Sequence, residues 1–405
     1  MITSRRGFVG GSSAAALLAA SRSASAQKKY DDGASDTEIK IGHFCPYSGP
    51  ASAYGVIGQA HQVFWKMVND TGGINGRKIN FITLDDGYSP PKSVEVTRQL
   101  VEQDKVLCLF NTLGTPTNTA IHKYVNQKKV PHLYVSTGAS KWGKPKEFPW
   151  TMGFQPDYHT EGVIYAKHAL ANVKDPKVGV LMQNDDYGKD YFEGFKEGIG
   201  DPAKIVKLVT YEVTDPTVDS QVIQLKDSGA NVFFNVSTPK FAAQSIRKAG
   251  DIGWKPAQYL NNVSGSVTSV MKPAGYDNSA GIITAAYLKD PTDHQWDSDD
   301  EMKMWREYMT KYMPQANQGD ANYVFAYAVA TLMRETLKKC GDNLTRENVM
   351  KQAANYQKFR VPLLLPGITV STSPTDFYPI QAVQLSRFKG ESWDLFGDIM
   401  AAEST

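Results

Sequence analysis

Short apolar runs alternate with helical patterns along most of this chain, and this alternation constrains the fold more than any other feature. Apolar side chains recur at helical spacing over residues 58–69, and Gly72-Gly73 ends that helix. A β-α-β succession predicts parallel strands joined by crossover helices, and therefore an α/β fold. The first group comprises strands over 39–44, 78–84, 106–110 and 132–135, and helices over 58–69, 93–103 and 117–127.

The same alternation starts again after Phe154-Gln155-Pro156. A chain of 405 residues exceeds what one hydrophobic core usually serves. The sequence therefore predicts two doubly wound, Rossmann-like lobes rather than one extended sheet. The second group comprises helices over 158–171, 187–198, 218–227 and 239–250, and strands over 177–182, 205–210 and 232–235.

The N-terminal segment has the three parts of a removable export signal. Arg5 and Arg6 precede a weakly apolar run over 10–20, and Ala24-Ser25-Ala26 forms a small-x-small site. The stretch Ser4-Arg5-Arg6-Gly7-Phe8 resembles a twin-arginine signal, which exports folded proteins. We expect a signal peptide over 1–26, cleavage after Ala26, a flexible lead-in over 27–37 and a periplasmic location. No apolar run reaches the roughly 20 residues that span a bilayer, so the mature chain is not expected to be membrane-spanning.

Charge and cysteine content exclude several classes of protein. The 44 basic and 42 acidic residues give a net charge of +2 without long basic runs, so nucleic acid is not an expected partner. The spacing of Cys45, Cys108 and Cys340 suggests no metal site, and Cys108 lies in an apolar run typical of a buried position. A bridge between Cys45 and Cys340 remains open.

No catalytic signature stands out in the sequence. The seven histidines show no metal-binding spacing, and two Ser-x-x-Lys matches lack companion motifs. Asp85-Asp86 and Asp185-Asp186 are typical of solvated loop acids. We therefore expect a binding protein without a cofactor rather than an enzyme.

Six loops rich in Gly, Ser, Thr, Asn or Tyr each follow a short apolar stretch. In doubly wound sheets, ligands bind beyond the C-terminal ends of strands, near helix N-termini. One such loop could simply turn the chain and cap a helix. Six of them, three in each lobe, predict facing polar surfaces; they are 46–54, 113–117, 136–140, 183–188, 237–239 and 261–264.

Several motifs together resemble periplasmic binding proteins of the branched-chain amino-acid type, which serve ABC transporters. They are Ile39-Lys40-Ile41-Gly42, Ser48-Gly49-Pro50 with Tyr54-Gly55, Gly72-Gly73-Ile74-Asn75-Gly76-Arg77-Lys78-Ile79, Asp85-Asp86 with Pro91, and Asn184-Asp185-Asp186-Tyr187-Gly188. The resemblance implies the type I periplasmic-binding fold, an ABC permease of the inner membrane as partner, and three crossovers near Pro156, Ala286 and Leu364. Lobe 1 would then comprise 38–156 and 287–364, and lobe 2 would comprise 157–286 and 365–405.

The resemblance also implies a binding site for a small-molecule carboxylate, which closure of the hinge would enclose. Hydroxyls and free amides at a helix N-terminus stabilise an anion, so two loops of lobe 1 would hold the carboxylate. The residues implied are Tyr54, Thr115, Pro116, Thr137, Gly138 and Ala139 from lobe 1, and Tyr187, Asn262 and Val263 from lobe 2.

The loop at Asn262 departs from the family pattern, which places an acid there for the ligand's ammonium. No Asp or Glu lies between Tyr259 and Met271. Burying an unpaired ammonium costs several kcal/mol, against about 8 kcal/mol for a micromolar ligand. A zwitterion would need another acid, such as Glu161 or Asp185.

Aromatic side chains in the same loops favour flat apolar ligands. The expected ligand is therefore a carboxylate without an amine, an aromatic acid of the benzoate or cinnamate kind. A hydrophobic amino acid is the alternative ligand, and a ligand-sensing subunit is an alternative role. The aromatic residues are Tyr47, Tyr54, Trp142, Tyr158 and Tyr187.

Overall fold

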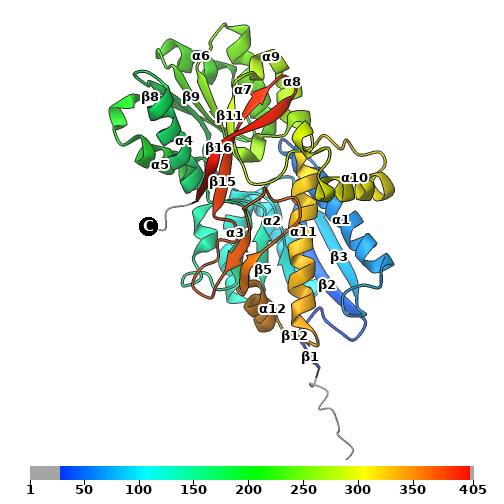
Figure 1. The fold of residues 1–405 in the computed structure, drawn as a ribbon. Helices are drawn as coiled ribbons and strands as arrows, with labels where there is room; N and C mark the ends of the chain where they lie inside the picture. The colour runs from blue at the N-terminus through cyan, green and yellow to red at the C-terminus, as the bar shows by residue number, and fades with distance from the viewer. Residues whose placement is uncertain (1–27, 402–405) are drawn as a thin grey trace, which may run out of the picture.

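Two α/β lobes lie one above the other in the computed structural model, which describes residues 28–401 (Figure 1). The predicted signal peptide therefore lies outside the described residues. Lobe 1, at the bottom of the view, combines the blue and cyan N-terminal part with the gold helix α11 (Ala321–Cys340). Lobe 2 is green and carries the red hairpin of β15 (Ala382–Lys389) and β16 (Ser392–Ala401).

Lobe 1 is built on a five-stranded parallel sheet in the order β3-β2-β4-β5-β6. Strands β2, β4, β5 and β6 are largely buried because helices cover both faces of a parallel sheet, whereas the edge strand β3 is half-buried. The strands are β2 (Glu38–Cys45), β3 (Lys78–Asp85), β4 (Cys108–Phe110), β5 (His132–Val135) and β6 (Thr151–Gly153). The helices are α1 (Gly55–Asp70), α2 (Pro90–Arg98), which continues as the π-helical turn η2 (Gln99–Gln103), and α3 (Thr115–Gln127).

Lobe 2 is built on a seven-stranded sheet in the order β16-β15-β11-β10-β9-β7-β8. Strands β7 to β11 are parallel, whereas β15 pairs antiparallel with β11 and with β16. The parallel strands are β7 (Val178–Gln183), β8 (Ile205–Tyr211), β9 (Val232–Val236), β10 (Ala257–Leu260) and β11 (Ile283–Ala286). The helices are α4 (Tyr158–Asn172), α5 (Asp186–Ile199), α6 (Asp219–Asp227) and α7 (Pro239–Asp251).

The parallel strands of both sheets are arranged in the same order, with the second strand of each lobe beside the first and the later strands on the other side. This order creates a switch point between the first and third strands, where loops diverge and leave a crevice. The prediction of two doubly wound lobes is confirmed. The sequence did not predict the short strands β6, β10 and β11 or the antiparallel hairpin β15–β16.

The remaining elements follow β11 in the chain. The segment after β11 hydrogen-bonds to the returning segment, with Lys289 N donating to Leu363 O over 2.8 Å and Leu365 N donating to Tyr287 O over 2.9 Å. These two paired segments make a short double-stranded connection between the lobes. The elements between them are α10 (Asp300–Tyr312), α11, β12 (Asn343–Leu344), α12 (Arg346–Ala353) and β13 (Tyr356–Phe359), and β14 (Val370–Thr372) pairs with β13.

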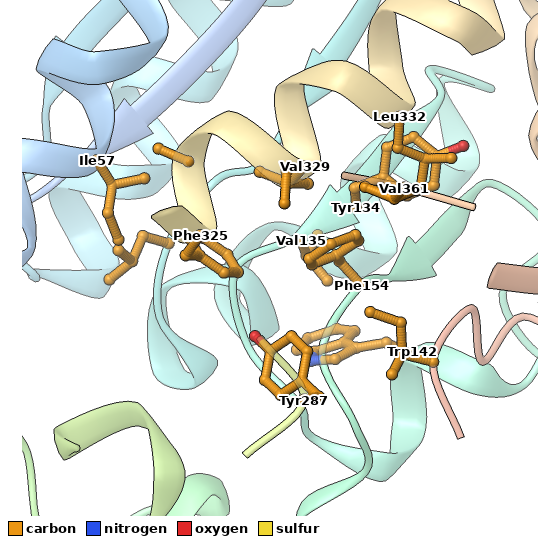
Figure 2. Packing of buried hydrophobic residues seen from close by; sticks show 14 of the residues in the cluster. Ile57, Tyr134, Val135, Trp142, Phe154, Tyr287, Phe325, Val329, Leu332 and Val361 are labelled. Atoms are coloured by element: carbon orange, nitrogen blue, oxygen red, sulfur yellow. The ribbon is translucent and has the colours of Figure 1, made fainter. Parts of the chain in front are cut away.

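The core of lobe 1 lies directly under the cleft between the lobes. Figure 2 shows side chains of α11 packed against β5 and Phe154. The Phe154 ring lies 5.7 Å from that of Phe325 and 6.4 Å from that of Tyr287, measured between centroids. Because close-packed cores leave little freedom to move, this contact fixes Phe325 and Tyr287 at the floor of the cleft.

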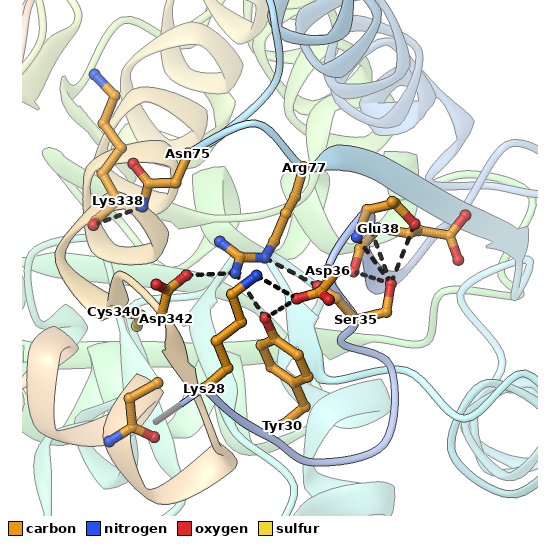
Figure 3. A network of polar contacts seen from close by, with 12 residues as sticks. Lys28, Tyr30, Ser35, Asp36, Glu38, Asn75, Arg77, Lys338, Cys340 and Asp342 are labelled. Carbon is orange, nitrogen blue, oxygen red and sulfur yellow. Dashed lines mark hydrogen bonds and ion pairs between the residues drawn. The ribbon is translucent and has the colours of Figure 1, made fainter. Parts of the chain in front are cut away.

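The lead-in is attached to lobe 1, which differs from the prediction of a flexible segment over 27–37. Strand β1 (Lys29–Tyr30) pairs with β12, and the buried Arg77 side chain donates to Ser35 O, Tyr30 Oη and Asp342 Oδ1 (Figure 3). A buried guanidinium requires acceptors, and the polar lead-in supplies two of the three. Arg77 of the family-like stretch is therefore structural.

The three cysteines are free and buried, so Cys45 and Cys340 do not form a bridge. Cys108 is buried in the lobe 1 sheet, as its apolar surroundings predicted. In residues 28–401, no helix is both long and apolar enough to cross a bilayer.

Candidate functional site

A cavity of about 140 Å³ lies between the two lobes. By this measure it has room for on the order of ten water molecules, which suits a small organic acid or an amino acid equally well. Its lining includes residues that follow β2, β4 and β5 in lobe 1 and β7, β9 and β10 in lobe 2. These are the C-terminal ends of parallel strands, where doubly wound sheets bind their ligands.

Two threonine hydroxyls of lobe 1 face the cavity from neighbouring loops. Thr115 begins α3 and Thr137 follows β5, and their Oγ1 atoms lie 2.6 Å apart. The Thr137 hydroxyl also accepts from Ala139 N and from the indole of Trp142, each over 3.3 Å. No side chain caps the N-terminus of α3, so its first amides and its dipole are available to an anion.

Gly114 allows the approach of α3 to the cavity. Its φ of 101° favours glycine, and a Cβ there would lie 2.6 Å from the Tyr88 ring. Asp86 holds the turn before Tyr88, accepting from Tyr88 N over 3.0 Å and from Ser93 Oγ over 2.8 Å. The expectation that both acids of Asp85-Asp86 are solvated is wrong for Asp86, which is fully buried because it serves this turn.

Lobe 2 contributes Tyr187, the second residue of α5. Asp185 caps this helix by accepting from Tyr187 N over 3.0 Å and from Gly188 N over 3.2 Å. The Tyr187 side chain is buried, yet its hydroxyl has no hydrogen-bond partner among residues 28–401. Buried polar atoms are normally paired, so an unpaired hydroxyl in a cavity wall indicates a position for a ligand atom.

Glu161 lies behind the cavity wall and is saturated with hydrogen bonds. Its carboxylate accepts from Tyr165 Oη over 2.6 Å, Tyr191 Oη over 2.9 Å, Asn262 N over 2.8 Å and Asn262 Nδ2 over 2.7 Å. Burial raises the pKa of Glu161 to about 7, although these donors favour its charged form. Since its lone pairs are in use, Glu161 cannot directly bind a ligand's ammonium.

The acids that reach the cavity are Asp290 and Asp293, which follow β11. Asp290 accepts from the backbone N and the hydroxyl of Thr292, and burial raises its pKa to about 6. The adjacent Lys289 is turned to Asp299 and Glu301, at 2.7 and 2.9 Å. From the sequence, the acids expected near a ligand were Glu161 and Asp185. Asp290 and Asp293 were not expected, because the segment after β11 reaches the cavity only through pairing with the chain that returns between the lobes.

Direct bonds join the lobes across the cleft. Tyr54 Oη donates to Val263 O over 3.0 Å within the cavity. At its edge, Ser140 donates through N and Oγ to the Asp190 carboxylate, at 2.7 Å each, and Lys141 pairs with Asp186 at 2.7 Å. These contacts indicate a closed arrangement of the lobes.

The structure brings six of the nine predicted site residues to the cavity wall, and the other three lie behind it. Pro116 is within the first turn of α3, Ala139 N bonds to Thr137, and Gly138 packs against the Tyr158 ring. The six at the wall are Tyr54, Thr115, Thr137, Tyr187, Asn262 and Val263.

The sequence analysis did not assign several further lining residues to the site. In the sequence their segments look like ordinary turns and connections. They lie far apart along the chain and come together only in the folded protein. They include Tyr88, Gln155, Thr284, Tyr287, Asn322, Phe325 and Ser386.

Comparisons with known proteins agree with this geometry. A family model described as periplasmic binding protein matches residues 38–392. The Leu/Ile/Val-binding protein homolog 1 of Brucella abortus (strain 2308) is 23% identical over 335 residues, which cover 80% of this chain and 85% of that protein.

Two solved structures show the same fold. One is a branched-chain amino-acid ABC transporter protein from Thermus thermophilus with bound valine, with a TM-score of 0.81 and 14% identity, covering 90% of this chain and 97% of that one. The other is a solute-binding protein of an ABC transporter from Rhodopseudomonas palustris BisB5 in complex with 3,4-dihydroxybenzoic acid. Its TM-score is 0.73 with 19% identity, covering 90% of this chain and 96% of that one.

Proposed function

This chain belongs to the periplasmic binding protein family, and we propose that it captures a small carboxylate between its lobes, with an aromatic acid favoured. Membership of a family of binding proteins also confirms the prediction that it is not an enzyme. One observation carries the proposal, namely that the hydroxyls of Thr115 and Thr137 lie together at the uncapped start of α3 in the cavity wall.

The lobe 1 side of the cavity suits an anion held by neutral donors. Hydroxyls and helix N-terminal amides stabilise a carboxylate without a buried countercharge. Lys289 is the cationic side chain in the lining, and it is paired with two acids. The expected contacts of the carboxylate are therefore Thr115, Thr137 and the first amides of α3.

Aromatic side chains support a flat ligand. Five tyrosines line the cavity, and offset or edge-to-face contacts with a ligand ring add about 0.5–1.5 kcal/mol beyond burial. A protein of the same fold holds 3,4-dihydroxybenzoic acid. The tyrosines are Tyr54, Tyr88, Tyr158, Tyr187 and Tyr287.

A hydrophobic amino acid is the second candidate ligand, and the structure adds an observation in its favour. Asp290 and Asp293 lie in the cavity wall and could meet an ammonium. The Brucella relatives are named Leu/Ile/Val-binding protein homologues, and the Thermus protein of this fold holds valine.

We further propose that the chain works in the periplasm, after export by the twin-arginine signal at residues 1–26, and delivers its ligand to an ABC permease of the inner membrane. Closure of the lobes around the ligand would produce the shape that the permease recognises. Export is tested by replacing Arg5 and Arg6 with lysine, which should leave the protein in the cytoplasm.

A thermal-shift screen of residues 27–405 tests the ligand class. A ligand at 100 times its Kd stabilises the folded state by about 2.7 kcal/mol, so benzoate or cinnamate should raise the melting temperature. Thr137→Val and Tyr187→Ala should each reduce this effect, whereas Thr210→Val, on the exposed side of edge strand β8, should not. Stabilisation by leucine without stabilisation by aromatic acids would contradict the favoured ligand, and unchanged affinity in both site variants would contradict the site.

A further inference from the structure

Asn262 is held in a fixed orientation by the buried carboxylate of Glu161. Two of the four donors to Glu161 come from this residue, its backbone N–H and its Nδ2 amide. The other two donors, Tyr165 and Tyr191, come from α4 and α5. A carboxylate only accepts hydrogen bonds, so it determines which end of the Asn262 amide faces it.

The opposite end of that amide is consequently an acceptor. The two ends of an asparagine amide are normally assigned from its hydrogen bonds, and here Nδ2 must point to Glu161. Asn262 lines the cavity, and its Oδ1 atom accepts no hydrogen bond from residues 28–401. The cavity wall of lobe 2 therefore presents an unused carbonyl oxygen.

We propose that Glu161 and Asn262 together select ligands that carry a hydrogen-bond donor, an ammonium or hydroxyl group, away from their carboxylate. This inference rests on the proposed function, since the carboxylate is taken to occupy the hydroxyls of Thr115 and Thr137. Asn262 contacts the ligand's donor, and Glu161 is a positioning residue that acts through Asn262.

The same acceptor serves both candidate ligand classes. A hydroxyl on an aromatic acid or the ammonium of an amino acid would donate to Asn262 Oδ1. A ligand without a donor would leave that oxygen desolvated and unpaired, which is unfavourable. Among aromatic acids we expect hydroxylated ones to bind more tightly than benzoate.

Two matched pairs of probes test this selection by titration calorimetry. 4-Hydroxybenzoate is compared with benzoate, and leucine with 4-methylpentanoate, which is leucine without its amine. In the wild type, the donor-bearing member of the pair that binds should have an affinity about tenfold higher, the effect of one hydrogen bond in a desolvated site. Asn262→Leu should abolish that ratio, because the variant has no carbonyl oxygen for one probe to bond and for the other to desolvate.

Glu161→Gln tests the positioning role. An amide at this position offers a donor as well as an acceptor, so Asn262 can turn over and present its NH₂ group to the ligand. The affinity ratio should fall at least several-fold, most for leucine, because an ammonium cannot accept a hydrogen bond. Glu197→Gln on the exposed side of α5 removes the same charge and should leave the ratio unchanged.

The pH dependence of the affinity ratio distinguishes the positioning role of Glu161 from a purely structural one. Burial raises the pKa of Glu161 to about 7, and a protonated carboxyl would no longer fix Asn262. The ratio for each pair should therefore fall as pH decreases from about 8 to about 6. Asp157, Tyr158, Tyr165, Tyr191 and Tyr287 also act electrostatically on Glu161, and burial raises the pKa of each of them as well.

Each outcome decides a specific question. Equal affinities within both pairs, or a ratio that survives Asn262→Leu, would overturn this inference and leave carboxylate capture standing. If the affinity ratio vanishes in Asn262→Leu but persists in Glu161→Gln at every pH, Asn262 selects the ligand's donor without any contribution from Glu161. Absence of binding by all four probes would contradict the carboxylate proposal and this inference together.

Discussion

The two lobes share a strand order but bring different chemistry to the cleft. Lobe 1 offers neutral donors, the hydroxyls of Thr115 and Thr137, fixed at strand ends. Lobe 2 offers the Tyr187 hydroxyl, which has no hydrogen-bond partner in the part of the chain that the structure describes, and an amide oxygen oriented by the buried Glu161. The difference indicates that the fold determines where a ligand binds, whereas the side chains of each half determine which part of the ligand it recognises.

The lobes also differ in the titratable groups they bury. Burial lowers the pKa of four histidines in lobe 1, to about 4 for His43, about 3 for His61 and His122, and well below the usual value for His132. In lobe 2 burial raises the pKa of carboxyl groups; they are Asp157, Glu161, Asp185 and Asp190.

This contrast predicts that acid destabilises lobe 1 first, the largest effect expected here. Below about pH 6.5 the unfolded chain protonates histidines that the native chain keeps neutral, so their contribution is complete above that pH and is lost as pH falls towards 4. While only the unfolded chain binds the proton, each such histidine lowers stability by up to about 1.4 kcal/mol per pH unit. The carboxyl groups of lobe 2, whose pKa burial raises, act in the opposite direction. Asp86 and Asp320 of lobe 1 and Asp290 of the connection between the lobes do the same. His168 of lobe 2, whose pKa burial lowers, acts in the same direction as the lobe 1 histidines.

Amide hydrogen exchange at about pH 7.5 and about pH 5, corrected for intrinsic rates, measures this difference. Protection in β2, β4 and β5 should fall much more than in β7 and β9. His294→Ala, at an exposed histidine, should not alter the pattern. Equal loss of protection in both lobes would show that the buried histidines do not control acid stability.

A pair of threonine variants tests which wall of the cavity, that of lobe 1 or that of lobe 2, binds the carboxylate. Thr137→Val should weaken carboxylate binding about 10- to 100-fold, because a hydrogen bond to a charged group contributes about 1.5–3 kcal/mol. Thr238→Val makes the same change in the lobe 2 wall, where the hydroxyl lies 3.3 Å from Tyr211 Oη, and should cost less than about threefold. Calorimetry with the ligand found by the screen gives both values, and a larger loss in Thr238→Val would reverse the assignment of the carboxylate.

The contacts between the lobes give the smallest predicted effect. Ser140→Ala removes one hydrogen bond to Asp190, about 1 kcal/mol, so ligand affinity should fall by about fivefold or less and the unliganded protein should become more open. Small-angle scattering reports the opening as a larger radius of gyration. Ser48→Ala, whose hydroxyl bonds to Asp85 within lobe 1, is the control. An unchanged radius and affinity in Ser140→Ala would mean that this contact does not bias closure.

The βα alternation was readable from the sequence because parallel strands buried on both faces appear as continuous apolar runs, as in 177–182 and 232–235. Strand β10 gave no such signal, whereas β11 lies within the apolar run 282–288, which was not recognised as a strand. The hairpin β15–β16 was missed as well, since β16 is half exposed and carries few apolar side chains in a row. The lead-in was misread because its partners, Arg77 and β12, are distant in sequence.

The candidate site was predictable where one strand end supplies a residue. Tyr54, Thr137 and Tyr187 follow strands in the way the strand-end rule requires, and they line the cavity. Asp290 and Asp293 were not found, because the segment after β11 reaches the cavity only through pairing with the returning chain. The sequence showed that the loop at Asn262 lacks an acid and named Glu161 as a possible substitute. It did not show that Glu161 lies behind the wall and accepts hydrogen bonds from Asn262, because the helix of Glu161 shares no motif with that loop.

Carboxylate capture by lobe 1 is the central claim, and one comparison of ligands tests it most directly. Titration of the wild type with benzoate against benzamide, and with leucine against leucinamide, replaces the carboxylate while leaving the rest of each molecule unchanged. We expect the acid of the binding pair to have at least about tenfold higher affinity, and Thr137→Val to remove most of that difference. Equal or tighter binding of the amides would contradict it.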